Sequence, residues 1–81
     1  MRVKVRLFAG LREALSRDQL ELELPPGATP EVAWQRLVAG RDDVAARRRG
    51  LAVAVNRQYS SFAAPLSEGD EVAFIPPVSG G

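Results

Sequence analysis

The chain has 81 residues, 46% of them hydrophobic and 26% charged, which is the composition of one ordinary globular domain and excludes a second core. Eleven basic and ten acidic residues give a formal net charge of +1, so no overall field attracts nucleic acid or an anionic membrane. Cysteine and histidine are absent, which excludes disulfides, thiolate metal sites, a cysteine nucleophile and the commonest general base.

The first segment, residues 2–8, alternates between apolar and polar side chains and predicts a half-buried strand. Val3, Val5 and Leu7 share one face, and Phe8 falls on the other face in phase with three cations. Two interpretations of Phe8 follow. Either the strand ends there and Phe8 packs inside, or Phe8 is exposed for a partner, because aromatic residues are enriched at interfaces.

A short helix and a second strand are predicted next. Residues 11–16 predict a short helix after Gly10, and residues 19–24 alternate again as a second strand. This strand ends at residues 25–27, because proline cannot continue the ladder and glycine permits a turn.

The main helix is predicted over residues 30–39. Thr29 is a typical N-cap and Pro30 suits the first helical position, while Gly40 is a stop signal. The spacing of Trp34 places it in the core, which we favour over a ligand-stacking role. Residues 42–50 follow as a short helical turn, with acids first and bases last to match the helix dipole.

The last third of the chain predicts three more strands and their turns. Residues 51–56 are a continuous apolar run with small side chains, typical of a strand covered on both faces. The remaining elements are a turn, a short strand, a second turn and a last strand, at residues 56–58, 59–60, 67–70 and 71–75. The order predicts an α+β fold, a mixed sheet of about five strands crossed by one main helix. The first and last strands are expected to be parallel neighbours.

The inventory of catalytic residues is poor. No Ser-His or Cys-His pair exists, and the scattered glycines form no phosphate-binding loop. Glu68, Asp70 and Glu71 cluster near one turn, where a solvated turn is favoured over a carboxylate metal site. Residues 47–49 are three arginines, for which a solvated helix end is favoured over phosphate or RNA binding.

Nothing in the sequence points to a membrane. The longest apolar run, residues 51–55, is far below the roughly 20 residues of a transmembrane helix. Residues 1–5 lack the apolar stretch of a signal peptide. We therefore expect a cytoplasmic protein without a metal.

The C-terminus stands out against this background. Pro76 and Pro77 favour an extended segment, and six residues beyond Ile75 reach about 20 Å. Gly80 and Gly81 lack side chains, so the terminal carboxylate can enter a channel too narrow for a Cβ atom. Activated as an acyl-adenylate, that carboxylate accepts sulfur or an amine. We predict a domain over residues 1–75 and an extended, flexible carrier tail over residues 76–81, with a frayed terminus as the alternative.

Three segments carry a family resemblance. Residues 65–81 resemble the C-terminus of the small subunit of molybdopterin synthase (MoaD type), one of the ubiquitin-like sulfur carriers. Residues 8–13 and 54–56 resemble two further signatures of that family, and the resemblance covers the whole chain. It implies a β-grasp, ubiquitin-like fold, which agrees with the element order.

The resemblance also implies a reaction cycle. An activating enzyme uses ATP to adenylate Gly81, and a sulfur donor converts the adenylate to a thiocarboxylate. The tail enters the large subunit of the synthase, where the sulfur passes to a cyclic pyranopterin precursor in molybdenum cofactor biosynthesis. The family's synthase is a heterotetramer of two small and two large subunits. The small subunit is a co-substrate more than an enzyme, and it holds no cofactor of its own.

Residue by residue, Gly81 matches the modified position and Gly80 its neighbour. The positions that the resemblance assigns to partner binding are Phe8, Arg12, Tyr59, Ile75, Pro76, Pro77, Val78 and Ser79. It therefore favours an exposed Phe8. Ile75 stands where some relatives carry an aromatic residue, and Tyr59 where they carry an aliphatic one. Pro30 replaces a branched aliphatic residue, which we interpret as a variation of the helix start.

The sequence also fits other functions. The same chemistry fits a carrier for tRNA thiolation or thiamine synthesis, or a protein modifier joined through Gly81 to lysines. An alternative of another class is a non-enzymatic β-grasp interaction module whose Gly-Gly ending is incidental.

Overall fold

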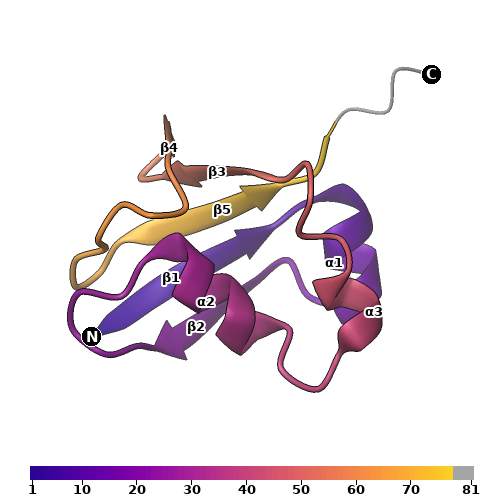
Figure 1. Cartoon of the computed structure of the whole chain (residues 1–81), viewed down its shortest axis with the longest axis horizontal. Helices are drawn as coiled ribbons and strands as arrows, with labels where there is room; N and C mark the ends of the chain where they lie inside the picture. The colour runs from indigo at the N-terminus through magenta and orange to yellow at the C-terminus, as the bar shows by residue number, and fades with distance from the viewer. Residues whose placement is uncertain (78–81) are drawn as a thin grey trace.

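The computed structural model describes residues 1–77, which form a five-stranded sheet with helices on one face (Figure 1). In chain order the elements are β1 (Arg2–Leu7), α1 (Ala9–Leu15), β2 (Gln19–Glu23), α2 (Pro30–Leu37), α3 (Asp42–Ala45), β3 (Ala52–Val55), β4 (Gln58–Ser60) and β5 (Glu71–Ile75). The α+β class is confirmed. The predicted segments are all present, although α1 begins two residues earlier than expected and α3 is short.

The sheet has the strand order β2-β1-β5-β3-β4. β1 and β5 are parallel, with Leu7 opposite Phe74, and the other neighbours are antiparallel. The predicted pairing of the first and last strands is confirmed. Because the two strands run in the same direction, Phe8 after β1 and Pro76 after β5 leave the sheet at the same edge.

The core lies between the sheet and the helices. Val3, Val5 and Leu7 of β1 are buried together with Val72 and Phe74 of β5. Trp34 of α2 is only 2% exposed, and its ring meets that of Phe74 edge to face with 5.3 Å between centroids. Trp34 is therefore a core residue, as its spacing predicts.

β3 differs from the prediction of a strand covered by layers on both faces. Val53 pairs with Phe74 and shares its core face, whereas Ala54 pairs with Ala73 on the opposite, open face of the sheet. Ala54 is still only 7% exposed, because longer side chains surround it. Its burial comes from small size beside large neighbours and not from a second layer.

Among the arginines at 47–49, Arg47 and Arg49 are exposed as predicted for a solvated helix end, whereas Arg48 is part-buried and differs from that prediction. The Arg48 guanidinium lies 3.4 Å from the centre of the Phe62 ring and forms a 2.8 Å ion pair with Glu31 of α2. Arg47 donates a 3.3 Å hydrogen bond to the carbonyl of Gly10. These two side chains hold the segment after α3 against α2 and α1.

The acidic side chains of the turn before β5 accept hydrogen bonds from backbone amides. Asp70 Oδ2 accepts a 2.7 Å hydrogen bond from the amide of Ser67, and Glu68 Oε1 accepts a 3.0 Å bond from the amide of Arg2. The favoured interpretation of this cluster as a turn is confirmed. Over residues 1–77, no three Asp or Glu side chains gather where they could hold a metal ion, and no helix has the length and apolarity to cross a membrane.

Candidate functional site

The open face of the sheet bears a hollow of about 390 Å³. Ala54 and Ala73, paired across β3 and β5, form its floor because their side chains are short. Longer side chains from β1, the β3–β4 hairpin and β5 complete the lining, which consists of Arg6, Phe8, Ala54, Arg57, Tyr59, Glu71, Ala73 and Ile75.

Two aromatic side chains mark the rim of this hollow. Phe8 is 39% exposed and Tyr59 is 79% exposed, and they are the exposed large hydrophobic residues within the part of the chain described here. Of the two interpretations of Phe8, the structure shows the exposed one. An exposed aromatic pair beside an apolar hollow is typical of a surface that another protein covers.

Local backbone geometry places both aromatic residues. Phe8 has an extended backbone at the N-cap of α1, so the alternation of β1 continues through it and its side chain lies on the face opposite the buried Leu7. Asn56 and Arg57 both have positive φ, 52° and 70°, which is typical of a type I′ hairpin turn. This tight turn sets Tyr59 of β4 opposite Ala54 of β3.

Asn56 fixes the hairpin to the sheet, a role that the sequence did not predict beyond a turn. Its Nδ2 donates a 2.9 Å hydrogen bond to Asp70 Oδ1, and its Oδ1 accepts a 3.0 Å bond from the amide of Glu71. The backbone amide of Asn56 also donates to the carbonyl of Glu71. The signal for this contact was an Asn at a strand end together with an Asp before the last strand.

The predicted partner-binding residues fall into separate places. Phe8, Tyr59 and Ile75 come together around the sheet-face hollow. Arg12 is exposed on α1. It does not line this hollow, nor a second hollow that lies at the base of the tail. The family resemblance therefore pointed to three residues that line one hollow and to a fourth that lies apart from it.

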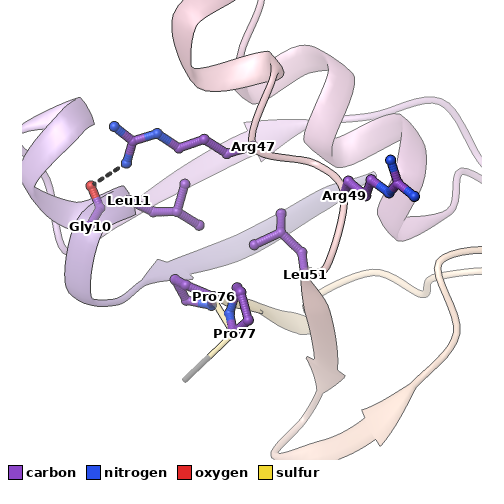
Figure 2. A pocket seen from close by; sticks show the side chains of 7 residues that line it. All are labelled: Gly10, Leu11, Arg47, Arg49, Leu51, Pro76 and Pro77. Atoms are coloured by element: carbon purple, nitrogen blue, oxygen red, sulfur yellow. Dashed lines mark hydrogen bonds between the residues drawn. The ribbon is translucent and has the colours of Figure 1, made fainter. Parts of the chain in front are cut away.

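A second hollow, of about 320 Å³, lies where the tail begins (Figure 2). Pro76 and Pro77 form one wall, facing Leu51, and Arg47 reaches across the opposite side to the Gly10 carbonyl. The first two residues of the predicted tail thus line this hollow, with Pro76 part-buried and Pro77 exposed. The remaining predicted tail residues, Val78, Ser79, Gly80 and Gly81, lie outside the described residues.

Several charged side chains away from the hollows form ion pairs. The N-terminal amine, first by hydrogen bonding, and then Arg2 lower the pKa of Glu23. Arg41 donates hydrogen bonds of 3.0 and 2.9 Å to Asp43 and lowers the pKa of that carboxyl to about 2. Both groups are at the surface, so these shifts describe surface ion pairs and not a catalytic centre.

Residues 5–81 match the ThiS family. The chain belongs to the ThiS family. The molybdopterin synthase sulfur carrier subunit of Escherichia coli (strain K12) is 41% identical over 83 residues, which cover 98% of this chain and 99% of the relative. ThiS-family membership and this similarity over the whole length confirm the resemblance seen in residues 8–13, 54–56 and 65–81.

Solved structures give the same fold. SAMP1 from Haloferax volcanii, a small archaeal modifier protein, superimposes with a TM-score of 0.87 at 26% identity, and all of both chains is covered. A complex of subunits 1 and 2 of the molybdopterin-converting factor from Helicobacter pylori 26695 contains a chain with a TM-score of 0.62 at 21% identity, again over all of both chains. The predicted β-grasp, ubiquitin-like fold is thereby confirmed.

Proposed function

We propose that this chain is the sulfur-carrier subunit of a molybdopterin synthase, with Gly81 as the group that carries sulfur. The observation that carries the proposal is the position of β5. Its last residue, Ile75, lines the exposed apolar hollow, and the next two residues start the tail at the same edge of the sheet. One partner can therefore cover the hollow and receive the tail.

The chemistry belongs to the terminal carboxylate. A carboxylate is a poor acyl donor, so an activating enzyme first joins Gly81 to AMP, using ATP and releasing pyrophosphate. A sulfur donor then displaces AMP and leaves a thiocarboxylate. ATP is a substrate of the activating enzyme and is not held by this chain. Gly80 and Gly81 have no Cβ, which lets the sulfur enter a narrow active site on the partner.

The proposed partner is the large subunit of the synthase, on which the cyclic pyranopterin precursor receives the sulfur. Phe8, Tyr59 and Ile75 contact it through the sheet-face hollow. The tail contacts follow along residues 76–79, and Arg12 of α1, which lines neither hollow, adds a separate charged contact. The name of the Helicobacter pylori complex, of subunits 1 and 2, supports such a pairing. We further propose a cytoplasmic heterotetramer of two small and two large subunits.

A chain lacking Gly81 separates binding from chemistry. We expect this variant to keep the melting temperature and the affinity of the full chain for the large subunit, because the hollow and residues 76–77 are intact. It should transfer no sulfur, because the carboxylate no longer reaches the same depth in the partner. Product formation from the pyranopterin precursor is the readout. Sulfur transfer at the wild-type rate would contradict the proposal.

A second candidate function is protein modification. It is favoured by the similarity to a small archaeal modifier protein, SAMP1. A modifier would be found joined through Gly81 to lysine side chains, and mass spectrometry of tryptic peptides detects that isopeptide bond. A non-enzymatic interaction module would instead keep its activity when residues are added after Gly81, whereas both carrier functions require a free terminal carboxylate.

A further inference from the structure

Arg6, which lines the sheet-face hollow, has a buried donor without an acceptor. Arg6 lies on the open face of β1, between Gln19 of β2 and Ala73 of β5. Its Nε is buried and has no hydrogen-bond partner within residues 1–77. The guanidinium carbon lies 5.7 Å from the centre of the Phe8 ring, at the aromatic rim of the hollow. Buried donors are nearly always paired in folded proteins, so an unpaired one needs an explanation.

Arg6 contrasts with other arginines of the chain. Five of them donate to carboxylates or carbonyl oxygens within the domain, namely Arg2, Arg36, Arg41, Arg47 and Arg48. Glu71 is the carboxylate among the described residues that line the hollow, but it stands opposite Lys4 in the sheet register and forms no ion pair with Arg6.

The surroundings of Arg6 leave room for an incoming acceptor. The short side chains of Ala54 and Ala73 open the hollow beside it. Arg6 and Arg57 face a single carboxylate there, so the hollow is locally positive on a chain that is nearly neutral. A guanidinium presents a planar fork of N–H groups that matches a carboxylate with two parallel hydrogen bonds.

We propose that Arg6 binds the carboxylate of an Asp or Glu of the partner protein. An apolar side chain of the partner fills the hollow beside this carboxylate. The Arg6 side chain turns from its unpaired position and forms charge-assisted hydrogen bonds with the carboxylate. Phe8 and Tyr59 then enclose the pair and exclude water from it. The inference rests on the proposed function, because it takes the large synthase subunit as the partner.

Calorimetric titration of the full chain with the large subunit encoded in the same genome tests this. We expect Arg6→Gln to weaken binding by roughly 10- to 100-fold, the range for losing a charge-assisted pair. Arg6→Lys keeps the charge without the fork and should recover only part of the affinity. The matched control is Lys4→Gln, which removes one charge from the same strand and face, and it should change affinity by less than about threefold.

Folding is checked in the same variants. Because Arg6→Gln removes an unpaired buried donor and no internal bond, its melting temperature should equal or exceed that of the wild type. Equal affinity of Arg6→Gln and wild type overturns the inference and leaves the proposed function intact. Equal weakening by Lys4→Gln and Arg6→Gln also overturns it, in favour of a general charge effect. A folded wild-type chain that does not bind the large subunit contradicts the proposed function itself, and the inference falls with it.

Discussion

Asn56 is the side chain on which the shape of the site depends most directly. It joins the β3–β4 hairpin to Asp70 and Glu71 through both atoms of its amide. We expect Asn56→Ala to lower the free energy of unfolding by roughly 1–3 kcal/mol, because it removes both bonds and the Asn that tolerates positive φ. Denaturant unfolding measures this loss. Gln58→Ala, in the same hairpin but exposed, should change stability by less than about 0.5 kcal/mol, and similar losses for the two would contradict the role of Asn56.

Phe8 is expected to act in binding and not in folding. Because its side chain is part-exposed at the rim of the hollow, Phe8→Ala should leave the melting temperature nearly unchanged. Binding to the large subunit should weaken by about tenfold or more, since buried aromatic residues dominate interface energies. Leu7→Ala, one residue earlier and in the core, should instead cost about 2–5 kcal/mol of stability. Lower stability with unchanged affinity in Phe8→Ala would place Phe8 in the core.

The Arg41–Asp43 pair predicts an acid dependence. The Arg41 hydrogen bonds lower the pKa of Asp43 from 3.8 to about 2 in the folded chain. A carboxyl with a depressed pKa stabilises the fold above its ordinary pKa, and this contribution disappears as the pH falls through the folded value. We expect Asp43→Asn to be slightly less stable than wild type at neutral pH, with the difference vanishing as the pH falls from 3.8 to about 2. Melting curves that differ equally at every pH would contradict this.

At the scale of elements, α2 has a defined start that can be tested. Thr29 Oγ1 accepts a 3.4 Å hydrogen bond from the amide of Val32, and Pro30 follows as the first helical residue. Thr29→Ala should cost about 1 kcal/mol of unfolding free energy, whereas Thr29→Ser should keep most of the cap. Thermal unfolding compares the two. An alanine variant as stable as the serine variant would show that the cap contributes nothing.

The positions of the elements could be predicted from sequence because they depend on local patterns. Alternation in residues 2–7 and the Thr29-Pro30 pair are visible along the chain, and the turn residues delimit the strands. Contacts between distant segments have no such signal. The Arg48 contact with Phe62 and Glu31, and the depth that Ala54 and Ala73 give to the hollow, depend on which strands become neighbours.

The candidate site was predictable to a similar extent. The family resemblance pointed to Phe8, Tyr59 and Ile75, which the fold brings to one surface. Arg6 was not distinguished from the other cations of the first strand, because a missing acceptor is a property of the folded surroundings. Sequence pattern alone cannot show which of the three alternating cations has a buried donor without a partner.

For the whole molecule, the sheet order explains how a small domain serves as a carrier. The parallel β1–β5 pair at the middle of the sheet places Phe8 and the start of the tail at one edge, and the rest of the chain stabilises this arrangement. In the proposed function, the exposed surface beside the tail binds the partner and Gly81 carries the reactive group. Recognition would then belong to the fold and chemistry to the last residue.

The most direct test of this account is the intact mass of the full chain after incubation with its activating enzyme, ATP and sulfide. We expect sulfur to replace one oxygen of the Gly81 carboxylate. Fragmentation should place the change at the last residue, and omitting ATP should prevent it. An unchanged mass, with an activating enzyme shown to work on another carrier, would contradict the claim that this chain carries sulfur.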